Sequence, residues 1–180
     1  AKWLWAAGLA FHWSFLIILL RHLRFFFEQV PFPIQVLDSL DSFLQIGIPL
    51  LYMTDVILLG AVTYLFFRRI GLPQVRYISL IGDYFPLFLI LGIGISGVLM
   101  RYFIKTDIVG VKVLAMGLIT FHPVVAETIG VIFFIHLFLL SALFAYFPMS
   151  KLVHIGGVFH SPTRNLANNS HEKRHINPWN

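Results

Sequence analysis

The stretch VVAETIGVIFFIHLFLLSALFAYF occupies residues 124–147 and decides the fold, because its length and hydrophobicity suit a lipid bilayer better than water. A helix needs about 20 mostly apolar residues to cross the hydrocarbon core of a membrane. This stretch carries a histidine, His136, well inside the apolar run. An ionisable side chain inside a membrane segment is costly and therefore requires a partner or a function. We predict a membrane-spanning helix that holds a functional histidine.

Similar apolar runs elsewhere in the chain predict an all-α integral membrane protein with four transmembrane helices in a bundle. The four predicted crossings are Trp3 to Phe27, Gln45 to Phe67, Ile78 to Met100 and Val124 to Phe147. The apolar segment Val111 to Phe121 is too short to cross, so it predicts an interfacial helix. A fifth helix ahead of Ala1 is also considered, because the first run starts almost at once.

The composition excludes several classes of protein. Hydrophobic residues make up 58% and charged residues 12%, against about 25% charged in ordinary soluble domains. The 180 residues contain no cysteine, which excludes disulfides and thiolate-bound zinc or iron–sulfur clusters within this stretch. The net charge is +5, but the basic residues lie at the ends of apolar runs, which favours a membrane protein over a nucleic-acid-binding one.

The distribution of Lys and Arg predicts the orientation in the cell's inner (cytoplasmic) membrane, because cytoplasmic loops carry the excess of positive charge. The richer side, predicted to be cytoplasmic, holds Lys2, Arg68, Arg69, Arg76, Lys151, Arg164, Lys173 and Arg174. The other side holds Arg21, Arg24, Arg101, Lys105 and Lys112. Both ends of the sequence are then cytoplasmic. We expect a transmembrane domain over residues 1–155 and a cytoplasmic, partner-docking tail over residues 156–180.

Four histidines in or beside the first and last runs predict two heme sites. His12 and His22 lie in the first run, whereas His136 lies inside the fourth and His154 follows it. If the fourth helix continues, His136 and His154 share a face, because their 18-residue separation (154 − 136) equals five helical turns. The first and fourth crossings are antiparallel, which pairs His12 with His154 and His22 with His136. Two imidazoles per heme iron give a low-spin site suited to electron transfer.

The segment from His136 to His154 reads HLFLL and then FPMSKLVHI, and it is similar to the last heme helix of the respiratory nitrate reductase gamma subunit family. The spacing of His12 and His22 also resembles that family's other heme helix. The resemblance covers nearly the whole chain. It implies two heme b groups, a distal one near the outer face on His22 and His136 and a proximal one on His12 and His154. It also implies menaquinone as substrate, exchanged near the distal heme, although Ser42 occupies the region of a family lysine near the quinone.

The polar tail adds a narrower resemblance. Its GVFHSPTRN at residues 157–165 and NPWN at residues 177–180 resemble the DsrM family of the sulfite-reduction-associated DsrMKJOP complex. That resemblance implies a cytoplasmic iron–sulfur partner of the heterodisulfide reductase type, together with other membrane and extracytoplasmic subunits, in dissimilatory sulfur metabolism. The alternatives are a cytochrome b subunit of a nitrate reductase or heterodisulfide reductase, and a heme-free membrane anchor or proton-relay protein.

Other polar residues have two interpretations each. Arg21, Arg24 and Arg101 either pair with heme propionates or extend to the lipid headgroups. Glu127 near the outer mouth of the fourth run is a candidate acceptor for a quinol proton, and His122 is either interfacial or a quinone contact. The segment Gly92-Ile-Gly94-Ile-Ser96-Gly97 formally matches a dinucleotide fingerprint, but it lacks the strand-turn-helix context. Its small residues instead favour close approach of helices or of a porphyrin.

Overall fold

The structure is a computed structural model that describes residues 2–160. The chain divides into two compact units, the first ending at Ala145 and the second starting at Tyr146. Most of the described residues are helical.

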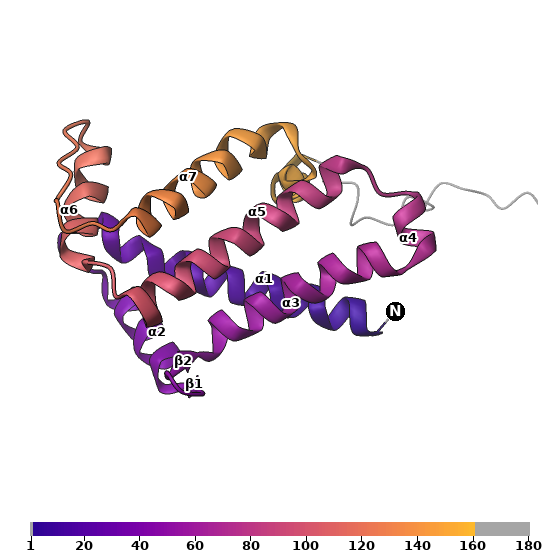
Figure 1. The fold of residues 1–180 in the computed structure, drawn as a ribbon, viewed down its shortest axis with the longest axis horizontal. Helices are drawn as coiled ribbons and strands as arrows, with labels where there is room; N and C mark the ends of the chain where they lie inside the picture. The colour runs from indigo at the N-terminus through magenta and orange to yellow at the C-terminus, as the bar shows by residue number, and fades with distance from the viewer. Residues whose placement is uncertain (1, 161–180) are drawn as a thin grey trace, which may run out of the picture. The chain divides into compact units, whose positions relative to one another are not determined.

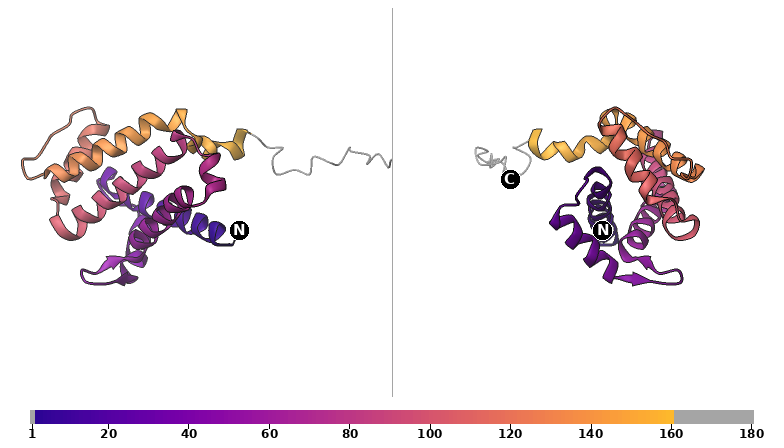
Figure 2. Two further views of the ribbon diagram at one scale, coloured as in Figure 1. Left: turned by 45° about the vertical axis from the view of Figure 1, so that its right-hand side comes forward. Right: turned by 90° about the vertical axis from the view of Figure 1, so that its left-hand side faces the viewer.

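The first unit is built from four long helices that run alternately in opposite directions, with short elements at their ends (Figure 1). The helices are α1 (Lys2–His22), α2 (Phe32–Phe43), α3 (Met53–Gly71), α4 (Pro73–Tyr77), α5 (Ile81–Val98), α6 (Ile108–Ile119) and α7 (Val131–Tyr146), and a hairpin is formed by β1 (Gln45–Ile46) and β2 (Leu51–Tyr52). Helix α1 packs against α3, and α3 packs against α5. Figure 2 shows the same helices along other directions, with the hairpin at the edge of the bundle.

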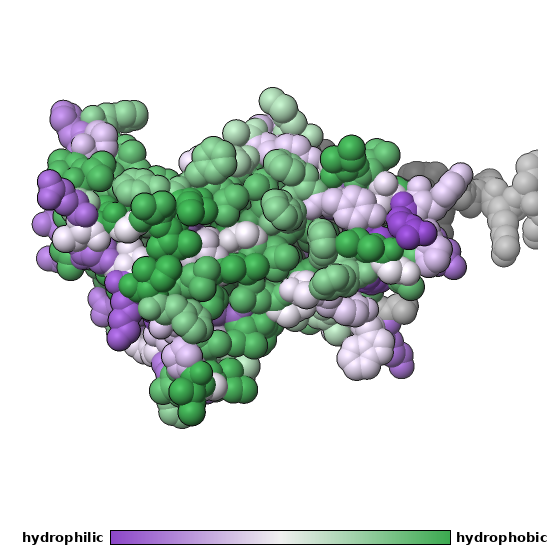
Figure 3. Space-filling model, viewed as in Figure 1, coloured by the Kyte–Doolittle hydropathy of each residue, from purple (hydrophilic) through white to green (hydrophobic). Residues whose placement is uncertain are grey.

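Within residues 2–160, three helical segments are long and apolar enough to cross a membrane, namely Lys2–Phe26, Ile81–Ile104 and Val131–Met149. On the face drawn in Figure 3, hydrophobic side chains cover the middle of the helices and hydrophilic ones gather toward their ends. Helix α3 carries Asp55 in its first turn and Arg68 and Arg69 in its last, and it is not among the three. The three crossings agree with the first, third and fourth predicted runs, and a fourth crossing at α3 stays a prediction.

The hydrophobic interior of the first unit lies where α3 meets α5. Val62 is fully buried, and Leu58 of α3 and Leu89 and Ile90 of α5 are nearly so. Many large apolar side chains point outward instead, among them Phe138 at 70% exposed. An apolar surface of this extent is what a helix bundle presents to lipid.

The second predicted crossing started in the wrong place, because residues 45–52 form a hairpin. Gln45 pairs with Tyr52 in this antiparallel hairpin, and Gly47 has a φ of 88°, a conformation that glycine adopts readily. The helix begins only at Met53. Helix α2 was not among the predicted elements. Pro33 lies in the first turn of α2, where proline is tolerated.

The predicted helices Val111 to Phe121 and Val124 to Phe147 are both present, but their bounds differ from the prediction. Helix α7 begins at Val131 rather than Val124, because the preceding residues form a loop in which the Thr128 hydroxyl donates to Asp107 Oδ2 at 2.5 Å. The predicted short helix exists as α6 and begins three residues early, because Asp107 caps it by accepting from the Val109 N–H at 3.0 Å.

The second unit contains two 3₁₀ turns, Phe147–Met149 and Lys151–Val153, and α8 (His154–His160). Helix α7 therefore ends at Tyr146, and Ser150 is extended, with φ −110° and ψ 167°. The condition for His136 and His154 to share a face, one helix that continues between them, is therefore not met. Proline cannot donate a backbone hydrogen bond, and Pro148 lies in the first of these turns. Most of the predicted docking tail, residues 161–180, lies outside the described residues.

Candidate functional site

The rings of His22, at the end of α1, and His136, in α7, lie together in the first unit. Their centres are 6.4 Å apart and their planes are 13° from parallel. Two imidazoles that bind one metal ion from opposite sides have metal–nitrogen bonds of about 2.0 Å, which place their ring centres roughly 6 Å apart. The observed separation therefore matches that of two axial ligands of one heme iron.

The hydrogen bonds of both rings suit metal ligation. His22 Nδ1 lies 2.7 Å from the Ile18 carbonyl oxygen, and His136 Nδ1 lies 2.9 Å from Ser96 Oγ. A metal-bound histidine almost always donates its second ring N–H to an oxygen in this way, which fixes the tautomer and the ring orientation. In His22 the partner is a carbonyl oxygen, which only accepts, so Nδ1 carries the hydrogen and Nε2 is the nitrogen available to a metal.

Small residues of α5 lie opposite side chains of α7. A Cβ added to Gly97 would lie 3.5 Å from Cε1 of His136, and one added to Gly92 would lie 3.2 Å from a methyl carbon of Leu139. A Cβ added to Gly94 would lie 2.8 Å from a side-chain carbon of Leu59 in α3, the helix that packs against α5, so the prediction that these small residues permit close approach of helices is confirmed for α3 and α5. The glycine segment lies inside α5, so it has no strand-turn-helix context.

His12 precedes His22 in α1 and has the same local geometry. Its Nδ1 lies 2.7 Å from the Gly8 carbonyl oxygen, and its side chain is exposed within the first unit. A Cβ added to Gly8 would meet nothing within 4 Å, so there is open space beside α1 one turn before His12. His154 belongs to the second unit, where its Nδ1 lies 2.9 Å from the Lys151 carbonyl oxygen. The pairing of His12 with His154 stays a prediction.

Arg21 is the centre of a buried ionic cluster, next in sequence to His22. Its side chain is 6% exposed, and it forms salt bridges with Asp41, with Asp38 at 3.3 Å and with Asp55 at 3.8 Å. Asp38 also pairs with Arg24 at 3.2 Å. Asp38 and Asp41 are three residues apart in α2 and therefore lie on one face of that helix.

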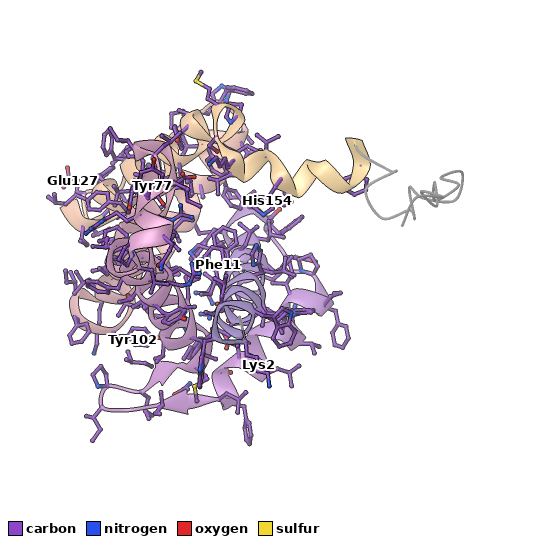
Figure 4. The ribbon with its side chains drawn as sticks, turned by 90° about the vertical axis from the view of Figure 1, so that its right-hand side faces the viewer. Lys2, Phe11, Tyr77, Tyr102, Glu127 and His154 are labelled. Atoms are coloured by element: carbon purple, nitrogen blue, oxygen red, sulfur yellow. The ribbon has the colours of Figure 1, made fainter. Side chains whose placement is uncertain are left out.

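Tyrosines connect this cluster to Arg101. The guanidinium carbons of Arg21 and Arg101 lie 4.3 Å and 4.0 Å from the ring centre of Tyr52, so the ring lies against two cations. The Tyr102 hydroxyl donates to Asp55 Oδ2 at 2.6 Å and accepts from the Tyr52 N–H at 2.9 Å. Figure 4 shows Tyr102 beside the hairpin. Arg21 therefore has carboxylates as its partners, and Arg24 and Arg101 stay candidates for heme propionates.

The two quinone candidates lie in the loop before α7. Both Glu127 and His122 are exposed (Figure 4 labels Glu127), and His122 Nδ1 lies 2.7 Å from the Thr120 carbonyl oxygen. A separate hollow of about 350 Å³ adjoins Arg24, and its lining consists of Arg24, Val30, Ile34, Gln35, Asp38 and Ser39. Sequence reasoning did not find this hollow, since α2 was not predicted.

The residues of the first unit fit a b-type heme. The separation of His22 and His136 and the oxygen atoms beside their Nδ1 atoms suit two residues that would hold one heme iron. Nearby arginines offer positive charge for propionates. Because a heme needs only two protein nitrogens, this pair is sufficient for one iron.

Comparison with known proteins agrees with this fit. A model of the nitrate reductase gamma subunit family matches residues 1–171. Two curated relatives carry the name "Hdr-like menaquinol oxidoreductase cytochrome b-like subunit". The relative from Archaeoglobus fulgidus is 49% identical over 183 residues, covering 99% of this chain and 55% of the relative. The relative from Archaeoglobus profundus is 44% identical over 182 residues, covering 99% and 54%. The chain spans about half the length of these relatives, and no solved structure matches it.

Proposed function

Because the chain belongs to the nitrate reductase gamma subunit family, we propose that it is a diheme cytochrome b subunit that transfers electrons between menaquinol and an iron–sulfur partner. The family and the three long apolar helices make it a multi-pass membrane protein. The cytochrome b-like family implies heme b. The number of hemes, the residues that hold them, the quinone and the partner belong to the proposal.

The observation that carries the proposal is the approach of His22 and His136. Their rings come from helices that are far apart in the sequence, yet the ring centres lie 6.4 Å apart. Both residues also have an oxygen atom at hydrogen-bonding distance from Nδ1. We assign these two residues as the axial ligands of a distal heme.

His12 and His154 are proposed as the ligands of a second, proximal heme. Support comes from the oxygen partner of each Nδ1 atom and from the antiparallel course of α1 and α7 (Figure 1). A bis-histidine heme supplies reversible one-electron transfer without an open position for oxygen. The chain itself holds and orients the ligands, keeps water away with apolar helices and supplies charge near the propionates.

The ionic cluster around Arg21 fixes the end of α1 that carries His22. Arg24 and Arg101 are proposed to contact heme propionates, because guanidinium groups bind carboxylates bidentately. Glu127 is proposed to accept a proton from quinol, and His122 to contact the quinone. Both residues lie in the loop that precedes α7, a few residues before the ligand His136.

In the proposed topology the chain crosses the inner membrane four times, with α3 as the second crossing. Both ends of the sequence lie on the cytoplasmic side. The excess of Lys and Arg at that side supports this orientation. The proposed partner is a cytoplasmic iron–sulfur subunit of the heterodisulfide reductase type in sulfur metabolism. The names of the two relatives, which include "Hdr-like menaquinol oxidoreductase", support the partner class and the quinone.

A spectroscopic count tests the proposal. The detergent-solubilised full-length protein should contain about two protohemes per chain in a pyridine hemochrome assay and show a low-spin b-type spectrum on reduction. A menaquinol analogue should reduce the hemes. His136→Ala and His154→Ala should each lose about one heme. A heme-free parent protein would contradict the proposal and favour the membrane anchor or proton-relay alternative.

A further inference from the structure

Ser96 is a buried hydroxyl that reaches a proposed heme ligand from another helix. It lies in α5 and is 4% exposed. Its Oγ lies 2.9 Å from Nδ1 of His136 in α7. Burying a polar group in an apolar environment is costly unless the group is hydrogen-bonded. One of the two atoms, Ser96 Oγ or His136 Nδ1, must therefore donate a hydrogen to the other.

The other hydrogen bonds of Ser96 decide which atom donates to which. Its Oγ lies 2.8 Å from the Gly92 carbonyl oxygen and 3.0 Å from the Ile93 carbonyl oxygen. A serine hydroxyl has one hydrogen and two acceptor lone pairs. Since carbonyl oxygens only accept, the hydroxyl hydrogen goes to α5 and a lone pair is left for His136. The Nδ1–H of His136 therefore donates to Ser96, which leaves Nε2 as the unprotonated nitrogen.

His136 differs in this respect from the two histidines of α1. His12 and His22 each place Nδ1 2.7 Å from the carbonyl oxygen four residues earlier in their own helix. A backbone acceptor is present whatever side chain occupies the position. His136 instead finds its partners on a neighbouring helix, where Ser96 Oγ lies 2.9 Å from its Nδ1 and the Ile93 carbonyl is a second hydrogen-bond partner. Gly97 beside Ser96 lets its ring approach α5 closely.

We propose that Ser96 is a positioning residue that orients His136 and, through the Nδ1–H···Oγ hydrogen bond, lowers the reduction potential of the heme held by His22 and His136. The inference rests on the proposed heme function. A hydrogen bond accepted from the second ring nitrogen raises the basicity of a metal-bound imidazole. A more basic ligand stabilises the ferric state over the ferrous state, so the bond keeps this heme more difficult to reduce.

Ser96→Ala is the test variant, and Ser96→Thr is the rescue variant because threonine keeps the hydroxyl. Ser14→Ala is the matched control. Ser14 in α1 is 3% exposed, and its hydroxyl bonds to carbonyl oxygens of its own helix, Ala10 at 2.7 Å and Phe11 at 3.1 Å. The control thus removes an equally buried helical hydroxyl at a distance from His136 in the sequence.

Redox titration and low-temperature EPR of the full-length protein measure the potential and ligand geometry of each heme. In Ser96→Ala, one heme should shift to a more positive midpoint potential and change its g-values, whereas Ser96→Thr and Ser14→Ala should match the parent. Loss of that heme in Ser96→Ala but not in Ser96→Thr also supports the inference.

Three results would overturn the inference. These are an unchanged potential and EPR spectrum in heme-replete Ser96→Ala, an equal change in Ser14→Ala, and an equal change in Ser96→Thr. Because each is measured in protein that contains heme, they leave the proposed function standing. A parent protein without heme contradicts the proposed function instead.

Discussion

Arg21 and its neighbour His22 show what can be inferred from single residues. The sequence indicated His22 and His136 as a pair, because both are polar residues in apolar runs on helices of opposite direction. The sequence also indicated that Arg21 was functional or interfacial, but it could not show that Asp38, Asp41 and Asp55 surround it. Those contacts depend on a helix and a hairpin that were not predicted. Ser96 was missed as an individual residue, since its role depends on the packing of α5 against α7.

The burial of Arg21 predicts a large effect of its removal. In Arg21→Gln, buried Asp41 loses its countercharge, and breaking a buried ion pair from one side costs about 3–5 kcal/mol. In Arg24→Gln the loss should be about 0–1 kcal/mol, because that side chain is 24% exposed and its pair with Asp38 is partly solvated. Thermal unfolding in detergent, followed by helical circular dichroism, compares the two variants. Equal stability of both would contradict the role of the Arg21 cluster.

At the scale of elements, long apolar runs were recognised and their ends were not. The apolar run of the first helix is matched by α1 and the following turn, because nothing within it interrupts the helix. The start of α3 was placed too early, since hydropathy does not distinguish an apolar hairpin from a helix. The fourth run was extended through residues 124–130, whose loop is held by Asp107 and Thr128. Contacts between segments distant in sequence decide such boundaries.

The packing of α6 against the following loop predicts the effect of a single methyl group. A Cβ on Gly117 would lie 2.6 Å from the His122 carbonyl oxygen and 3.0 Å from Pro123 Cα. Both are backbone atoms, so Gly117→Ala should destabilise the protein by about 1–3 kcal/mol. Gly60→Ala in α3 is the control, because its Cβ would meet nothing within 4 Å, and it should be neutral or stabilising by up to about 1 kcal/mol. A stable Gly117→Ala would show that the loop is packed differently.

The cap of α6 predicts a pH dependence. Hydrogen bonds from Thr128 and from the Gly110 and Val109 N–H groups lower the pKa of the Asp107 carboxyl below its ordinary 3.8. Because the folded-state pKa is the lower one, the ionised cap stabilises the fold above pH 3.8 and this contribution is lost as the pH falls through the folded-state value.

The difference in thermal midpoint between the parent and Asp107→Ala should therefore be largest near neutral pH and should shrink in acid. Thr128→Val removes one of the three hydrogen bonds to the carboxyl, so its thermal midpoint near neutral pH should lie between those of the parent and Asp107→Ala. A difference that stays constant or grows as the pH falls would contradict the assignment of the cap.

At the scale of the molecule, opposite ends of the first unit are predicted to face opposite sides of the membrane. The 180 residues contain no cysteine, so single cysteines introduced here can be labelled selectively against the unsubstituted parent. Gln74→Cys in α4 should react with a membrane-impermeant maleimide only from the cytoplasmic side. Val125→Cys, at a side chain that is 58% exposed, should react only from outside. Labelling of both from one side would contradict the predicted topology.

The pairing of histidines is the central claim, and heme counts in double variants test it most directly. If His22 and His136 share one iron, the full-length His22→Ala/His136→Ala protein should lose no more heme than either single variant and keep about one heme per chain. The His12→Ala/His22→Ala protein should lose both hemes, because each substitution removes a ligand of a different iron. If the His22/His136 double variant loses all heme while each single variant keeps about one, the two residues belong to different hemes and the pairing is wrong.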